Sequence, residues 1–215
     1  MTEYLIPTQL AEAEFVEKKS RFIGQIRPVE TEEEARAYIE EIKKKHYDAR
    51  HNCWAYRLKA GGVERYADDG EPQGTAGQPI LNVFQREEVW NVVCVVTRYF
   101  GGILLGAGGL TRAYGKSAKD ALDASGISVV RPWTMVEADC PYTLFERFKL
   151  ELLPLQGVEG EHAFGAAITF RVLLPQGREE EFALRLQELS AGTVEPRVTG
   201  TVWKAVPWQT GEGQR

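Results

Sequence analysis

A glycine-rich run between a predicted strand and a predicted helix limits the folds open to this chain most strongly. Five of the ten residues from Phe100 to Gly109 are glycine. The apolar segment 89–97 predicts a strand before this run, and the segment 110–124 predicts a helix after it. Glycine lets such a turn adopt positive φ, and the first N–H groups of the helix are free to bind an anion. The run therefore predicts a strand–loop–helix unit that carries a binding loop.

Arginine at both ends of this run strengthens the interpretation as a binding loop. Tight packing of a helix on a strand would explain the glycines, but it does not require Arg98 and Arg112. We expect both guanidinium groups to contact phosphate, with the N–H groups of Gly106 to Leu110 completing the anion site. The full set of expected ligand-binding residues is Arg98, Tyr99, Gly101, Gly102, Gly106, Gly108, Gly109, Leu110 and Arg112, together with Thr75 and His51.

A second loop carries three carboxylates within four residues, at Asp68, Asp69 and Glu71. They could hold Mg²⁺ through water, or they could accept hydrogen bonds from the arginines across a cleft. A solvated turn is the alternative, because Asp-Gly and Glu-Pro form turns. Thr75 is expected to cap the helix that follows. No catalytic residue is assigned: His51 could act as a base, but a histidine that begins a strand is more often structural.

Charge and cysteine content exclude several classes of protein. The net charge is −5, with 18 basic and 19 acidic residues up to Pro132 and 8 and 12 after it. This balance excludes nucleic-acid binding by bulk charge, so any contact with RNA must be local. The three cysteines are far apart and predict free thiols. No segment suits a membrane span or a secretory signal, so we expect a cytoplasmic protein with no membrane partner.

Hydrophobic periodicity, together with the positions of proline and glycine, divides the chain into two parts. Before Pro132, the patterns predict a strand hairpin in 13–29, helices at 31–46 and 79–88, and strands at 51–58, 63–67 and 127–131. After Pro132, they predict strands at 135–139, 157–163, 166–174 and 193–206, with helices at 142–153 and 177–190. The second order, β-α-β-β-α-β, is that of a ferredoxin-like module. We therefore expect domains at 1–132 and 133–208, and a flexible tail at 209–215.

Three motifs together resemble the YigZ/IMPACT family: Asp48–His51, Asp68–Ile80 and Arg98–Tyr114. The resemblance implies an α+β protein with an N-terminal left-handed βαβ domain like domain IV of elongation factor G, and a C-terminal ferredoxin-like domain. Eukaryotic relatives regulate translation by competing for the coactivator of the amino-acid-starvation kinase. The two-domain layout resembles the bacterial branch, which has no established reaction.

Three functions remain open from the sequence. The preferred one is a non-enzymatic, translation-associated protein whose cleft binds phosphate of RNA, including the ribosome, or of a nucleotide. The second is a phosphoryl-handling enzyme like the small-molecule kinases, with Asp68 or Asp69 serving Mg²⁺ or acting as base and Arg98 or Lys116 neutralising charge. The third is a module that only binds a protein partner, such as a translation-related one, in which the glycines are architectural.

Overall fold

The computed structural model describes residues 2–208, and the chain divides into two compact units. The N-terminal unit takes in the chain up to Val130 and returns from Ala205 onward, and the C-terminal unit is Arg131–Lys204. Both mix helices with antiparallel pairs of strands. The tail predicted at 209–215 lies outside the described residues.

The N-terminal unit is built on a five-stranded sheet. Its strands are β2 (Ala11–Glu17), β3 (Ser20–Pro28), β4 (His51–Leu58), β5 (Val63–Ala67) and β6 (Val92–Tyr99), in the order β2-β3-β6-β4-β5. Every neighbouring pair is antiparallel. The central strand β6 is buried on both faces, which explains its unbroken apolar sequence.

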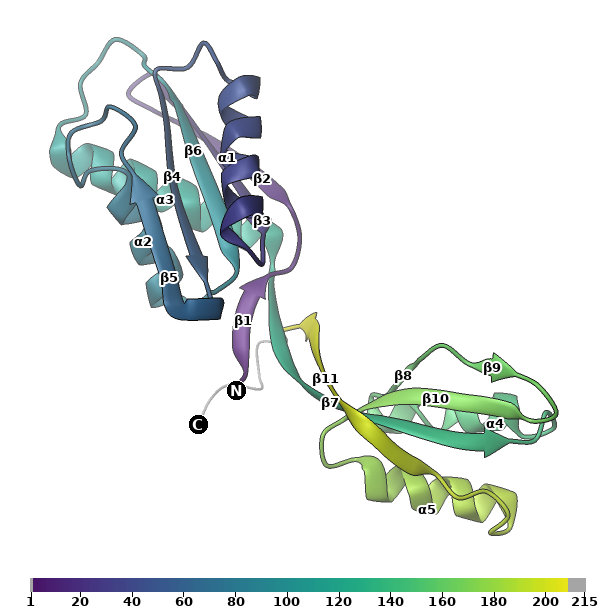
Figure 1. Ribbon diagram of the computed structural model, residues 1–215. Helices are drawn as coiled ribbons and strands as arrows, with labels where there is room; N and C mark the ends of the chain where they lie inside the picture. The colour runs from purple at the N-terminus through teal and green to yellow at the C-terminus, as the bar shows by residue number, and fades with distance from the viewer. Residues whose placement is uncertain (1, 209–215) are drawn as a thin grey trace. The chain divides into compact units, whose positions relative to one another are not determined.

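Helices cover both faces of this sheet (Figure 1). Helix α1 (Glu32–Lys45) packs on one face with Val93 and Val95, whereas α2 (Gly77–Arg86) and α3 (Ala107–Ser125) pack on the other with Cys94 and Val96. The predicted start of α1 is confirmed, since the Thr31 hydroxyl accepts a hydrogen bond from Glu34 N. A short 3₁₀ turn, η1 (Ala60–Gly62), joins β4 to β5.

Two crossover connections in this sheet have opposite hands. Strands β3 and β4 are parallel because each is antiparallel to β6, and α1 connects them. Strands β5 and β6 are parallel through β4, and α2 connects them on the other face. The second connection crosses the sheet in the opposite direction, between strands that also run the opposite way, and these two reversals cancel. Because its helix lies on the other face, the two connections have opposite hands, and one of them is left-handed. Left-handed connections of this kind are rare.

The glycine-rich loop is shorter than the sequence predicts. Helix α3 begins at Ala107 instead of residue 110, so Gly108 and Gly109 lie in its first turn. The last residue before the helix is Gly106, whose φ is 73°. Glycine was assigned to the loop because it disfavours helix, and the tertiary contacts of the following turns override that preference. A further strand, β1 (Tyr4–Pro7), was not predicted.

The C-terminal unit is a second sheet with two helices. The chain runs through β7 (Ile127–Cys140), α4 (Phe145–Leu150), η2 (Leu153–Leu155), β8 (Val158–Glu159), β9 (Ala163–Phe164), β10 (Ile168–Pro175), α5 (Glu179–Ser190) and β11 (Arg197–Pro207). The strand order is β11-β7-β10-β8, and β9 pairs with the end of β10. Val136, Phe148, Phe170, Phe182 and Leu186 are among its core residues.

The break between two strands that was expected at Pro132 is not present. The strands expected at 127–131 and 135–139 form one strand, β7, which runs through Pro132. Residues 127–130 pair with β1, and residues 133–140 pair with β10. Pro132 is tolerated because it falls between these two registers, where neither partner needs its missing N–H.

Within residues 2–208, every helix is too short or too polar to cross a membrane.

Candidate functional site

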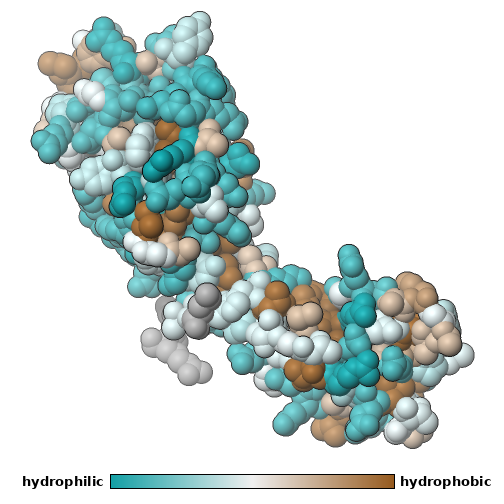
Figure 2. All heavy atoms as spheres, viewed as in Figure 1, coloured by the Kyte–Doolittle hydropathy of each residue, from teal (hydrophilic) through white to brown (hydrophobic). Residues whose placement is uncertain are grey.

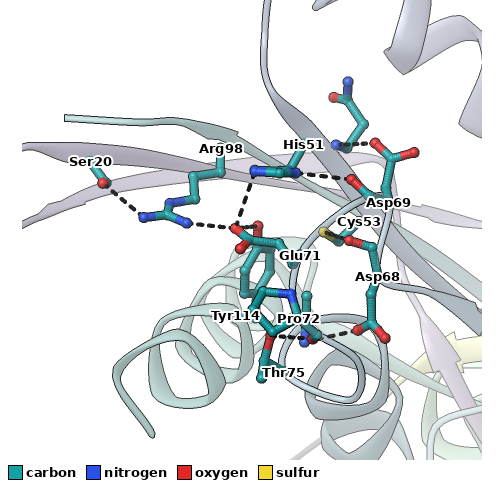
Figure 3. Close-up of polar contacts among 12 residues, drawn as sticks. Ser20, His51, Cys53, Asp68, Asp69, Glu71, Pro72, Thr75, Arg98 and Tyr114 are labelled. Carbon is teal, nitrogen blue, oxygen red and sulfur yellow. Dashed lines mark hydrogen bonds and ion pairs between the residues drawn. The ribbon is translucent and has the colours of Figure 1, made fainter. Parts of the chain in front are cut away.

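A buried ion pair connects the two loops that the sequence singled out (Figure 3). Arg98, near the end of β6, donates from Nη1 to Glu71 Oε1 at 2.6 Å, and the two side chains are only 6% and 4% exposed. Its Nη2 donates to the Ser20 hydroxyl at 3.3 Å. The acidic loop and the start of the glycine-rich loop therefore face each other. Arg98 is bonded to Glu71, which agrees with the alternative in which the carboxylates accept hydrogen bonds from the arginines. Its contact with phosphate stays a prediction.

Tyr114 and His51 complete the surroundings of Glu71. The Tyr114 hydroxyl donates to Glu71 Oε1 at 2.8 Å, and burial raises the pKa of this tyrosine far above its usual value. His51 Nδ1 lies 2.9 Å from the carbonyl oxygen of Asp69, which can only accept, so Nδ1 carries a hydrogen. His51 Nε2 lies 3.9 Å from Glu71 Oε1. The histidine is thus fixed in orientation by the acidic loop.

Asp68 caps helix α2. Its Oδ1 accepts hydrogen bonds from Ala76 N and Gly77 N at 3.1 and 2.9 Å, and its Oδ2 accepts from Gly74 N at 2.8 Å. Sequence reasoning assigned this cap to Thr75, whose hydroxyl instead donates to the carbonyl of Pro72. The correction has a physical reason: the turns between these residues fold the loop back, so a distant carboxylate reaches the first helical N–H groups.

The three carboxylates of the acidic loop point to different partners. Asp69 Oδ2 accepts from Asn52 N at 2.7 Å, and its Oδ1 lies 3.4 Å from Lys43 Nζ. Asp68 faces α2 and Glu71 faces Arg98, so the expected magnesium site formed by all three is not brought together. Within residues 2–208, no group of three His, Cys, Asp or Glu side chains could hold a metal ion.

A pocket of about 330 Å³ lies between the two loops. Glu71 and Pro72 line it from the acidic loop, and Leu104 to Ala107 line it from the glycine-rich loop. Arg50, His51 and Arg98 contribute its polar atoms, and Phe100 and Leu110 its apolar wall. Arg50 extends over the Phe100 ring, 5.7 Å from its centroid. Sequence reasoning missed Arg50, although it precedes His51 directly.

Helix α3 begins at the edge of this pocket. Its N-cap residue, Gly106, offers no side chain to the helix, and Leu110 N donates to the Gly106 carbonyl. The N–H groups of Ala107, Gly108 and Gly109 precede this first helical bond, and no side chain of the described residues caps them. The first turn therefore presents uncapped donors and the positive end of the helix dipole.

Arg112 lies on the other side of the helix start, away from the pocket that Arg98 lines. It is exposed and lines a separate hollow of about 170 Å³ with Lys18, Leu105 and Lys116. The expectation that Arg98 and Arg112 grip one anion is therefore corrected. Arg98 is buried near the end of β6, whereas Arg112 lies more than one helical turn into α3.

Tyr99 and Gly101 serve the structure around the loop. The side chain of Tyr99 lies on the α1 face of the sheet, where its hydroxyl meets His46 Nδ1 at 3.0 Å and donates to Asp48. Gly101 packs on the backbone of Lys19, and its N–H donates to the Ser20 hydroxyl. Gly102 is open, with φ of 85°. These residues shape the loop, and the hairpin turn of β2 and β3 lies against it.

Four cations around the glycine-rich loop lack a carboxylate partner. About half of the cations of residues 2–130 form ion pairs, as Lys43, Lys45 and Lys116 do with Asp69, Glu12 and Asp120. No carboxylate of residues 2–208 pairs with Lys18, Lys19, Arg50 or Arg112. Cations without an ion-pair partner therefore lie next to the loop, and Glu17 lines the same hollow as Lys18 and Arg112.

The cysteines are poor nucleophiles in this structure. Cys53, Cys94 and Cys140 are free and buried. Burial raises the pKa of Cys94 to about 12 and that of Cys53 further still. The Cys53 thiol donates to the carbonyl of Asp68 and helps to hold the acidic loop. A thiolate at neutral pH is disfavoured at both positions.

Comparison with known proteins places this geometry in a family. The model of the Impact N-terminal domain matches residues 18–122, and that of a domain of unknown function, DUF1949, matches residues 139–193. The IMPACT family member YvyE of Bacillus subtilis is 37% identical over 190 residues, which are 88% of each chain. The chain belongs to the IMPACT family.

Other IMPACT family members extend the comparison. YigZ of Escherichia coli is 34% identical over 198 residues, which cover 91% of this chain and 97% of that protein. The protein IMPACT homolog of Dictyostelium discoideum is 38% identical over 106 residues, 47% of this chain and 30% of its own. A solved structure described as that of an hypothetical protein has a TM-score of 0.59 at 33% identity, covering 93% of this chain and 98% of its own. The Impact N-terminal match contains both loops.

Proposed function

We propose that this IMPACT family member is a non-enzymatic, translation-associated binding protein. Its N-terminal unit would bind phosphate of RNA or of a nucleotide beside the glycine-rich loop. Arg50 and the first-turn N–H groups of α3 form the contact on the pocket side, and Arg112 with Lys18 forms it on the other side. Arg98 and Glu71 hold the two loops in place for this contact.

The observation that carries the proposal is the set of unpaired cations Lys18, Lys19, Arg50 and Arg112. A protein with balanced charge gains RNA affinity only where cations are local and uncompensated. Arg50 lines the pocket beside the first residues of α3, and Lys18 and Arg112 line the hollow that Gly109 also lines. The uncapped donors of this first turn favour an anion for the same electrostatic reason. Phe100, 37% exposed beside Arg50, adds a ring on which a base can stack.

The fold supports a role in translation. One of the two crossovers is left-handed, which fits the left-handed βαβ fold, like domain IV of elongation factor G, that the family resemblance implies. The strand order β11-β7-β10-β8 fits a ferredoxin-like C-terminal domain. Phosphoryl transfer gains less support, because the carboxylates it requires at Asp68 and Asp69 are bonded to backbone N–H groups.

Co-sedimentation with ribosomes and separated subunits at moderate salt tests the proposal. We expect the wild type to bind and Arg50→Ala/Arg112→Ala to lose most binding at an unchanged melting temperature. The control, Arg65→Ala/Arg147→Ala, removes two other exposed arginines, which line neither the pocket nor the hollow beside the loop. The double change at the loop should also lower the salt slope of RNA binding by about one for each phosphate that the variant no longer neutralises.

Three results would contradict this proposal. Absence of ribosome binding at every salt concentration would remove the translation role as stated. If the loop variant and the control lose ribosome binding equally, the net charge of the protein governs binding, and this site does not. Binding unchanged by Arg50→Ala/Arg112→Ala would favour a protein-interaction module in which the glycines only shape the loop.

A further inference from the structure

Strand β11 is an edge strand whose charged and proline residues, Arg197, Lys204 and Pro207, lie outside its central segment. It lies at one end of the order β11-β7-β10-β8, so among residues 2–208 it pairs only with β7 (Figure 1). The segment from Val198 to Trp203 contains no charge and no proline. Proteins usually guard such an edge with charges, proline or a bulge, since its free N–H and C=O groups can pair with another strand.

Apolar side chains are exposed along this edge. Val198 is 60% exposed and Val202 37%, and Met135 on the neighbouring strand is 38% exposed. The Met135 sulfur lies 3.7 Å from the place that a Cβ would take on Gly200. Met135 alternates along β7 with the core residues Val136 and Ala138, so its side chain lies on the opposite face of the strand. Figure 2 shows hydrophobic side chains at the surface of this unit.

The sequence of this edge is a palindrome. Residues 198–202 read Val-Thr-Gly-Thr-Val, with Gly200 at the centre. When two copies of such a strand pair antiparallel about a two-fold axis at Gly200, each side chain meets its own kind. Val198 of one copy is opposite Val202 of the other, and Thr199 is opposite Thr201. Apolar and Thr–Thr pairs across antiparallel strands are stabilising.

The ends of the segment fit the same register. Arg197 is opposite Trp203 of the other copy, so no two like charges meet at the ends of the segment. Its charge is already balanced, because Arg197 Nη2 donates to Glu137 Oε1 at 2.5 Å. The central pair, Gly200 opposite Gly200, contributes no side-chain contact, so the side-chain pairs on either side of it carry the pairing. The pairing is isologous, the type found in two-fold dimers.

We propose that β11 pairs antiparallel with β11 of a second copy of this chain, with the two-fold axis at Gly200. The two four-stranded arrangements β11-β7-β10-β8 join into one continuous sheet. This self-association is independent of the proposed phosphate site, which lies on the N-terminal unit, and of the ribosome experiment that tests it.

Sedimentation velocity of the full chain over a range of concentrations tests this pairing. We expect the wild type to reach twice the 24.1 kDa mass of one chain. Val198→Lys/Val202→Lys places lysine opposite lysine twice and should weaken the dimer at least about tenfold. Val198→Lys/Val202→Glu places lysine opposite glutamate twice and should retain it. Both variants change exposed side chains, so their melting temperatures should match.

The paired variants make the outcome decisive. A wild type that stays monomeric up to its solubility limit overturns the proposal. So does a dimer that Val198→Lys/Val202→Lys leaves intact, because that dimer uses another surface. If both variants lose the dimer equally, the register about Gly200 is wrong.

Discussion

Glu71 Oε1 accepts a hydrogen bond from Arg98 Nη1 at 2.6 Å and one from the Tyr114 hydroxyl at 2.8 Å. One buried carboxylate oxygen thereby joins the acidic loop to strand β6 and helix α3. The arginine that the sequence most strongly assigns to a ligand is a structural element in the folded protein. Substitution of this arginine therefore tests the stability of the fold, whereas substitution of the surface cations tests ligand binding.

Arg98→Met should destabilise the protein by about 3–5 kcal/mol, because it leaves the buried Glu71 carboxylate without its charge partner. The free energy of unfolding in urea measures this loss. Arg98→Met/Glu71→Gln should recover part of the loss, since the charge is then removed with its partner. Arg112→Met, the control, should change stability by less than about 0.5 kcal/mol. A loss below about 1 kcal/mol for Arg98→Met would contradict the role of the pair.

Asp68→Ala should destabilise the protein by about 1–2 kcal/mol through loss of the α2 cap. Asp68→Asn should cost less, since an amide oxygen can still accept from Ala76 and Gly77. Thermal and urea unfolding report both changes. The matched control is Asp120→Asn, whose carboxylate forms an exposed ion pair with Lys116, and it should stay within about 0.5 kcal/mol of the wild type. Equal stability of Asp68→Ala and Asp120→Asn would exclude the cap.

Gly101→Ala should cost more than Gly102→Ala, although only Gly102 has positive φ. A Cβ at Gly101 would lie 2.0 Å from the Lys19 carbonyl, so the hairpin turn must move away. At Gly102 there is open space, and the cost is the backbone strain of about 1 kcal/mol. Unfolding free energies of the two variants give the comparison. The reverse order would show that the loop and the hairpin do not pack as described.

As the pH falls, the free energy of unfolding should decrease because His46 is protonated less readily in the folded protein than in the unfolded chain. Burial, with Lys45 nearby, lowers the pKa of this histidine below 6.5, and Gln25 Nε2 lies 3.0 Å from its Nε2. The unfolded chain binds a proton first as pH falls, so this contribution is complete above pH 6.5 and is lost as pH drops through the lowered pKa.

Urea unfolding between about pH 7 and pH 5 should show a shallower pH dependence for His46→Gln than for the wild type. Other titrating groups are common to both proteins and cancel in the comparison. A direct measurement is the imidazole titration by NMR, which should give a pKa under 6.5 for His46. Identical pH dependence in the two proteins would contradict the prediction.

Local patterns in the sequence predicted most elements of the N-terminal unit. Helix α1 begins after Thr31 and ends before His46, because capping and the spacing of Tyr38, Ile39 and Ile42 are local properties. The strong apolar run of β6 likewise appears as a strand, shifted by a few residues. Family membership could also be predicted, since the two loop motifs are contiguous in the chain.

Elements whose ends depend on partners were predicted less well. The strand expected at 157–163 is reduced to β8 and β9, two short pairs with β10. Proline at 132 signalled a break, yet β7 passes through it because two different strands pair on either side. The helix expected at 142–153 ends as α4 and η2, where Pro154 removes an N–H.

Local sequence patterns suffice to predict the two loop motifs, the family, and the helices and strands that periodicity encodes. The bond between Arg98 and Glu71, the Asp68 cap on α2, and the place of Arg50 at the pocket follow from the folded structure. The reason is physical: propensity and amphipathicity act over a few residues. The partner of a charged side chain is chosen by burial and distance among residues that only the folded chain brings together.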